Sequence, residues 1–324
     1  MHSTWFVFIV LVVLLWAATS LIYKAGVHKE PEMHTDIKYS ISVGIVFFVI
    51  SLIYLIIRDE PFSIWESAVR YWPMTLFGIV YPIINTVSFN GYIYNEVTVE
   101  SPIEGISGGT STIMLIATYL MLGRVGSISE LLTPLRTIGM LVILFSIVLL
   151  AHSRNSEGRR RENPDAENKK ISWKWRGLGT LIFPVLFAMV DSMETVVSGI
   201  CLDSTFGYAM PEGDSIILVG MEYSIFSLGC WIYLLVKEHD VYHPLKRENL
   251  PRLLGSVTDN IGIVFYSYAM AIDSISTDPV LAVYPVLSMI GGRVFMKEKV
   301  SPVQYISLLL IVFGSILVVA DTLV

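Results

Sequence analysis

Long hydrophobic runs alternate with short polar connections along almost the whole chain. Each run has about 17–23 residues, the length that an α-helix needs to cross roughly 30 Å of hydrocarbon. Backbone amides in lipid must be satisfied within their own segment, and these runs are too long and too uniformly apolar for barrel strands. The pattern therefore predicts ten transmembrane helices, at residues 5–25, 37–57, 72–93, 101–122, 134–151, 178–200, 216–236, 250–272, 280–296 and 303–320.

One polar segment, residues 152–173, separates the first five runs from the last five. It is rich in Arg, Glu and Asn, and we expect it to be a solvated linker. The sequence thus predicts three parts: a first five-helix repeat at 1–151, the linker at 152–173, and a second five-helix repeat at 174–324.

The two halves resemble each other weakly but in the same order. Residues 72–102 align with residues 249–279 without a gap, so that Gly78 falls on Gly255 and Pro102 on Pro279. Because five is an odd number, consecutive copies cross the membrane in opposite senses, and such inverted repeats are typical of secondary transporters. We therefore expect an all-α, polytopic membrane protein with ten transmembrane helices in two inverted five-helix repeats.

Composition narrows the possible functions. Hydrophobic residues make up 54% of the chain and charged residues 15%, whereas soluble domains carry about a quarter charged residues. The ten runs use nearly the whole sequence, so we expect no catalytic domain and no enzyme. The sequence has no GxxxxGK[ST] phosphate loop, which argues against ATP as the energy source. All six histidines lie outside the runs, so we expect no metal site and no cofactor.

Basic residues are distributed unevenly over the connections. Numbered from the N-terminus, the odd connections hold 18 of the 22 Lys and Arg residues, and the even ones hold Arg58, Arg70, Arg124 and Arg136. The positive-inside rule places the richer side in the cytoplasm and both termini outside. We expect a multi-pass protein of the plasma (inner) membrane, and we interpret the basic linker as a solvated face and not as a nucleic-acid site.

Acidic residues inside the runs are the strongest indication of chemistry. Asp191 and Glu194 lie three residues apart in a run without any basic residue, and Asp259 lies near the middle of another run. Residues at i and i+3 share a helix face, and a charge at the centre of a span costs about 2.5–3.5 kcal/mol or more. This face should therefore point into a cavity. Glu222 and Glu104 are further acids, for which a structural role is the more frequent outcome.

Three interpretations of the buried acids remain open. Each could be a protonated, structural acid that is hydrogen-bonded to a neighbouring helix. Burial favours the neutral form of a carboxyl group, so that protonation could alternate with substrate binding. The acids could also contact a cationic substrate directly. Asp191 and Asp259 are the leading candidates for contact with a proton or a cation.

The C-terminal stretch VLAVYPVLSMIGGRVFMKEKVSPVQYISLLLIVFGSILVVA (280–320) resembles the closing helices of EamA-type members of the drug/metabolite transporter superfamily. The similar features are Pro285, the small residues Ser288, Gly291 and Gly292, and Glu298. The opening segment WAATSLIYKAG (16–26) is similar too. Two features depart from the family pattern: Arg124 stands where the family suggests Glu, and both termini are usually cytoplasmic in the family. The orientation in the membrane therefore stays open.

The resemblance implies a central cavity built from the first, third, fourth, sixth, eighth and ninth helices. Aromatic side chains on these helices would attract ammonium groups, although each could equally be a packing residue. The predicted residues for binding substrate or protons are Asp191, Glu194, Asp259, Trp16, Asn85, Tyr81, Phe89, Tyr266 and Tyr284.

The expected function is secondary-active transport of a small metabolite by alternating access, with or without coupling to protons. The acidic bias favours a cationic or zwitterionic substrate such as an amine, a quaternary ammonium compound or an amino acid. Export is the more frequent role in the family. The expected partners are the substrate, protons and the lipid bilayer, in a monomer or homodimer. The alternative is a non-transporting membrane scaffold or an intramembrane enzyme, which a solute flux assay would separate.

Overall fold

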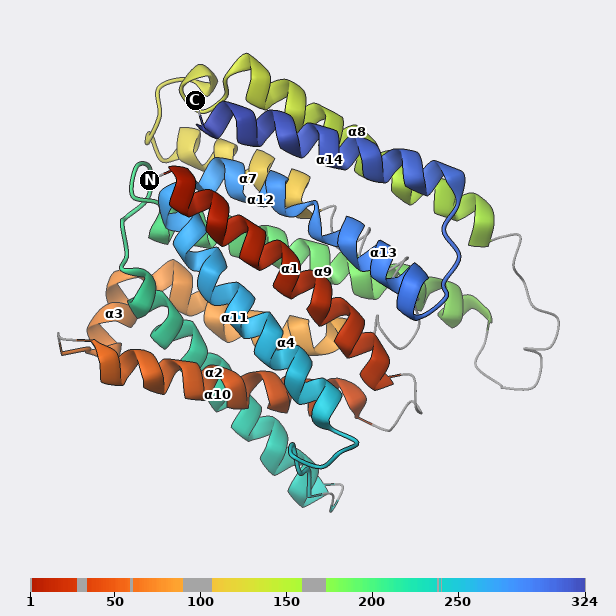
Figure 1. Ribbon diagram of the computed structural model, residues 1–324. Helices are drawn as coiled ribbons and strands as arrows, with labels where there is room; N and C mark the ends of the chain where they lie inside the picture. The colour runs from red at the N-terminus through yellow and green to blue at the C-terminus, as the bar shows by residue number, and fades with distance from the viewer. Residues whose placement is uncertain are drawn as a thin grey trace.

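The computed structural model describes residues 2–27, 34–58, 61–89, 107–158, 173–237, 239 and 241–323. In these residues the regular structure is entirely helical, and the long helices pack side by side in one bundle (Figure 1). The two ends of the chain lie at the same end of the bundle, which we call the terminal side. Each of the ten expected runs contains a helix.

The first half of the chain contains α1 (His2–Val27), α2 (Thr35–Ile57), the short α3 (Ile64–Arg70), α4 (Trp72–Ser88), α7 (Ser107–Met121), the 3-10 helix η1 (Ile128–Glu130) and α8 (Pro134–Gly158). The second half contains α9 (Trp173–Leu202), α10 (Glu212–Lys237), α11 (Leu250–Ile272), α12 (Ser274–Leu281), α13 (Tyr284–Phe295) and α14 (Pro302–Leu323). Helix α8 continues seven residues into the segment expected to be the linker. The end of the run 72–93 and the start of the run 101–122 lie outside the described residues.

Six described helical segments are long and apolar enough to cross a membrane: Ser3–Gly26, Thr35–Ile57, Val185–Leu202, Glu212–Lys237, Ser274–Phe295 and Pro302–Asp321. Two shorter apolar helical segments, Thr110–Met121 and Pro134–Ser146, accompany them. Many large apolar side chains face outward, among them Ile57, Phe145 and Leu309, as expected where lipid replaces water. The chain is a multi-pass membrane protein.

The helices pack in pairs that join the two halves of the chain. Helix α1 lies along α11, α2 along α10, and α8 along α14, while α9 contacts both α4 and α7. Small residues allow the closest approaches. A Cβ atom added at Gly44 would lie 1.9 Å from Ser227 Oγ, and one added at Gly220 would lie 2.2 Å from Ser51 Oγ. These two glycines and two serines form what we call the α2–α10 seam.

The ninth run, expected at 280–296, is longer than predicted and is interrupted. The Asp273 side chain caps α12 by accepting a hydrogen bond of 2.9 Å from Ser276 N–H, so the helix begins at Ser274. The helix then stops at Leu281, and α13 starts at Tyr284 with Pro285 in its first turn. Proline has no N–H, so the helical bond to the carbonyl four residues earlier is missing. All eight side chains of α12 are buried.

Candidate functional site

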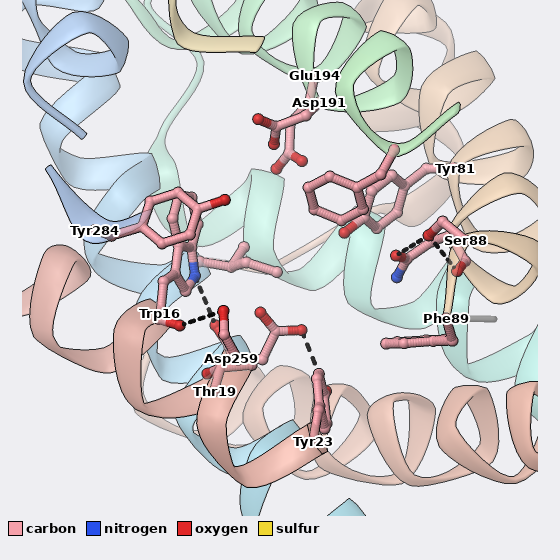
Figure 2. A pocket seen from close by; sticks show the side chains of 14 residues that line it. Trp16, Thr19, Tyr23, Tyr81, Ser88, Phe89, Asp191, Glu194, Asp259 and Tyr284 are labelled. Atoms are coloured by element: carbon pink, nitrogen blue, oxygen red, sulfur yellow. Dashed lines mark hydrogen bonds between the residues drawn. The ribbon is translucent and has the colours of Figure 1, made fainter. Parts of the chain in front are cut away.

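A pocket with a volume of about 50 Å³ lies among α1, α4, α9, α11 and α13 (Figure 2). The residues that line it are Trp16, Thr19, Ser20, Tyr23, Tyr81, Asn85, Ser88, Phe89, Phe187, Asp191, Glu194, Asp259, Ile263 and Tyr284. Eight of the nine predicted site residues are among them. The exception is Tyr266, which lies behind the wall with its ring 5.5 Å from that of Trp16.

Three carboxylates face the pocket from two helices. Asp191 and Glu194 come from α9, and Asp259 comes from α11 on the opposite side (Figure 2). Asp191 accepts a hydrogen bond from Ser107 of α7, and Asp259 accepts a long one, 3.4 Å, from the Tyr23 hydroxyl. Glu194 makes no hydrogen bond or ion pair with the described residues. No Lys, Arg or His is found among the described residues that line the pocket.

Aromatic rings form much of the remaining wall. The ring of Trp16 meets that of Tyr284 edge-on, with centroids 5.7 Å apart, and Tyr23 meets Phe89 in the same way at 5.4 Å. Helix α11 makes room for Trp16 at Gly262, where an added Cβ would lie 2.5 Å from the indole nitrogen. Sequence spacing alone did not indicate this contact, because Gly262 lies far from Trp16 in the chain.

Asn85 has a packing role in addition to its place on the wall. Its side-chain amide donates to the Tyr223 hydroxyl at 3.2 Å, and Tyr223 is completely buried on α10. The hydroxyl of Ser88 donates to the Asn85 backbone carbonyl at 2.7 Å. The bond to Tyr223 joins the end of α4 to α10, so the Asn85 amide also holds these two helices together.

The remaining sequence candidates lie outside the pocket. Glu222 packs against Gly78 of α4, and its buried Oε2 atom has no hydrogen-bond partner among the described residues. Glu104 lies outside the described residues.

Asp278 is the acid that the sequence reasoning missed. It falls in a connection between two hydrophobic runs, but the structure places it inside α12 with only 5% of its surface exposed. It accepts hydrogen bonds from Ser111, Thr195 and Tyr266. A capping residue at Asp273 is the sequence signal that could have extended the helix over Asp278.

The arrangement attracts positive charge but leaves little space for a ligand. Three carboxylates beside aromatic faces, in a region away from water, favour a cationic ligand. Pockets for organic ligands have volumes of roughly 300–1,000 Å³, whereas about 50 Å³ accommodates only a few water molecules. A metabolite can therefore enter only if the helices move apart. Within the described residues, no group of three or more His, Cys, Asp or Glu side chains could hold a metal ion.

Comparison with known proteins points to a transporter. Residues 182–320 match the model of the EamA-like transporter family. No curated protein matches the sequence. A crystal structure matches over 98% of this chain and 96% of its own, with a TM-score of 0.61 and 15% sequence identity. That likeness shows a shared fold along nearly the whole of both chains.

The family match lies in the second half of the chain, and the helices it covers include α10, α11, α12, α13 and α14. It also includes the part of α9 that carries Asp191 and Glu194. Together with the multi-pass helical fold, it indicates a membrane transporter of the drug/metabolite type. The resemblance to EamA-type members of the drug/metabolite transporter superfamily is confirmed: the chain carries an EamA-like transporter region from residue 182 to residue 320.

Proposed function

We propose that this protein is a secondary-active carrier that moves a small cationic or zwitterionic metabolite across the plasma (inner) membrane. Candidate substrates are amines, quaternary ammonium compounds and amino acids. The observation that carries the proposal is the lining of the pocket, where Asp191, Glu194 and Asp259 meet aromatic rings without a basic residue in the described part of the wall. Negative charge that no protein cation neutralises is best balanced by a positively charged ligand.

Contacts between the two halves support the idea that they are inverted repeats. Gly44 of α2 meets Ser227 of α10, and Gly220 of α10 meets Ser51 of α2. The two glycines are 176 positions apart in the sequence, and so are the two serines, so the two contacts are equivalent in the two halves. The hydrogen bonds from Ser227 Oγ to Ser40 O and from Ser51 Oγ to Ile216 O are equivalent in the same way. A two-fold axis in the membrane plane would produce such pairs.

A second glycine contact supports the same symmetry. Gly139 of α8 and Gly314 of α14 are 175 positions apart, and an added Cβ at either one would lie 2.7 Å from the carbonyl oxygen of the other. Residues that sit on a two-fold axis meet their own counterparts in this manner. In our proposal the two five-helix halves move against each other and expose the pocket to each side of the membrane in turn.

Proton exchange supplies the driving force in this proposal, and the net direction is export. The carboxylates of the pocket would release a proton when a cation binds and take one up when it leaves, because positive ligand and proton compete for the same negative charge. The small volume of the pocket fits a conformation that is closed between two open ones.

The first test is a thermal-unfolding screen of the purified, full-length protein against amines, quaternary ammonium compounds, amino acids and nucleosides. A ligand at about 100 times its Kd stabilises the fold by about 2.7 kcal/mol, which corresponds to an increase in Tm of about 5–10 °C. Cationic or zwitterionic compounds should produce this increase. Stabilisation by nucleosides alone would contradict the substrate class.

The second test measures flux of the best ligand in proteoliposomes with an imposed pH gradient. A carrier should accumulate the ligand against its own gradient and should lose this activity when the pH gradient is collapsed. A ligand that stabilises the protein but does not cross the membrane would contradict the carrier function.

A further inference from the structure

Asp278 lies outside the pocket, at a junction of four helices. From its place on α12 it accepts hydrogen bonds from Ser111 of α7 at 2.6 Å, from Thr195 of α9, and from Tyr266 of α11 at 3.1 Å. One carboxyl group therefore ties α12 to three other helices. All three donors are hydroxyl groups, and the ionised carboxylate of Asp278 can accept all three because both of its oxygens have free lone pairs.

The same hydroxyls have other acceptors within reach. Ser111 Oγ lies 3.2 Å from Gly108 O, and Thr195 Oγ1 lies 3.2 Å from Asp191 O. If Asp278 took up a proton, its own O–H would donate to one hydroxyl, and that hydroxyl could turn to its own helix. The network can thus be satisfied with Asp278 either ionised or protonated.

The junction is connected to the pocket on two sides. Thr195 follows Asp191 by one helical turn and bonds its backbone carbonyl. The ring of Tyr266 is tilted against that of Trp16, with centroids 5.5 Å apart, and Trp16 lines the pocket. A movement of α12 would therefore reach the pocket wall directly.

Helix α12 lies nearer the terminal side of the bundle than α13, which contributes Tyr284 to the pocket (Figure 1). Near its start, Thr277 accepts a hydrogen bond of 3.0 Å from the indole of Trp5, close to the N-terminus of the chain. Its cap Asp273 pairs with Arg136 of α8 at 3.5 Å, and Arg136 also pairs with Asp321 near the C-terminus. The pocket is lined by residues of α1 from Trp16 to Tyr23, farther along this helix than Trp5.

The helices that pack on α12 bring charged and polar groups to Asp278 or to its neighbours on α12. Helix α9 presents Asp191 and Glu194, whose charges repel that of Asp278, and α11 presents Tyr266. Helix α8 presents Arg136, which is paired with Asp273. Helix α7 presents Ser111, which bonds Asp278 itself, and α1 presents Trp5, which bonds Thr277. Helix α14 also packs on α12.

We propose that Asp278 is a positioning residue whose protonation opens the terminal side of the pocket, an inference that rests on the proposed carrier function. Ionised Asp278 holds α12 against α7, α9 and α11, because separation would leave a charge without donors in the interior of the membrane. Protonated Asp278 is neutral, and its separation costs far less. Proton binding at Asp278 therefore permits the pocket to open toward the terminal side.

The test is labelling of a single cysteine at Ile275 with a membrane-impermeant maleimide in proteoliposomes. Ile275 is buried and lies one turn before Asp278 on the same face of α12. The native cysteines, Cys201 and Cys230, are replaced by Ala. A cysteine at the exposed Ser129 on the terminal side corrects for the effect of pH on the thiol itself. The corrected labelling rate should rise by about tenfold per pH unit of acidification while the protonated form is the minority.

Three variants separate the effect of protonation at Asp278 from a general weakening of helix packing. Asp278→Asn should be labelled rapidly and independently of pH, because it cannot ionise. Tyr266→Phe removes one donor and should move the labelling midpoint by about one pH unit upward. Tyr119→Phe is its matched control, because this buried hydroxyl bonds Gly199 O and Ser274 on the same side but not Asp278. It should leave the midpoint unchanged.

Two outcomes would overturn the inference: a corrected labelling rate that does not change with pH, or an unchanged midpoint in Tyr266→Phe. If Asp278→Asn fails to fold, the tyrosine pair still decides. Labelling does not depend on the substrate, so its failure is distinct from that of the carrier proposal. A protein that shows the labelling pattern but no flux would contradict the carrier function alone.

Discussion

The α2–α10 seam and the pocket are both buried between helices from the two halves, but their polar groups differ in how completely they are hydrogen-bonded. In the seam, Ser227 donates to a backbone carbonyl at 2.6 Å, and a Cβ added at either glycine would overlap a serine of the facing helix. Among the described residues of the pocket, Glu194 has no hydrogen bond, and the Asp259 carboxylate has only a long one from Tyr23. Such incomplete satisfaction costs stability, which indicates that the pocket is organised for a ligand and the seam for packing.

The largest effect is expected from overfilling the seam. In Gly44→Leu, the new side chain would overlap Ser227 of α10. Because α2 and α10 are packed closely at this point, Ser227 has no room to move aside. Overpacking costs about 1–3 kcal/mol and occasionally more, so Tm should fall by about 10 °C or the folded protein should be lost. Gly229→Leu on α10 is the matched control, because nothing lies within 4 Å of its added Cβ. Equal losses in both variants would show that the seam is not tightly packed.

Removal of a charge from the pocket should affect transport and not folding. Asp191→Asn should reduce transport by about 100-fold or more in proteoliposomes, because one carboxylate interaction of several kcal/mol is lost, while Tm stays the same or rises. The control is Glu222→Gln, which neutralises a membrane acid outside the pocket. Wild-type flux in Asp191→Asn would remove this residue from the site.

The aromatic wall should contribute to affinity more than to rate. Trp16→Ala should raise the apparent KM for a cation by about tenfold, the equivalent of a cation–π interaction of roughly 1–2 kcal/mol, with a smaller change in maximal rate. Trp65→Ala, at a position that is 76% exposed on α3, provides the comparison for the loss of an indole. An unchanged KM in Trp16→Ala would place the substrate elsewhere in the pocket.

The smallest effect tests the symmetry of the seam. Ser51→Ala and Ser227→Ala each remove one hydroxyl bond to a backbone carbonyl, and each should lower the free energy of unfolding by about 1 kcal/mol. Chemical or thermal unfolding of the two variants should give similar losses if the halves are equivalent. A loss confined to one variant would mean that the two contacts have the same geometry but do not contribute equally to the free energy of unfolding.

The long helices were predictable because hydrophobic length is a strong signal. The run 250–272 coincides with α11, although the polar side chains around Asp259 make this helix too hydrophilic for a span by hydropathy alone. The acids of the pocket were predictable as well, since a carboxylate in a hydrophobic run has few stable places other than a cavity.

Local signals within polar segments were overlooked. Ser63 caps α3 by accepting from Glu66 N–H at 3.4 Å, a spacing typical of a helix start. The beginning of α12 was missed in the same way, because Ser274 to Asp278 are too polar to count as part of a hydrophobic run. Contacts between distant residues, such as Trp16 on Gly262, depend on the tertiary arrangement and leave no local pattern.

The interruption between α12 and α13 has a mechanical consequence. A continuous helix resists bending because each turn is bonded to the next, whereas a joint at a proline has low bending stiffness. Rotation of α12 about Ala282 and Val283 would displace Asp278 while α13 keeps Tyr284 against the pocket. The joint itself thus adds little resistance to a movement of α12, and the bonds of Asp278 decide whether α12 moves while α13 remains in place.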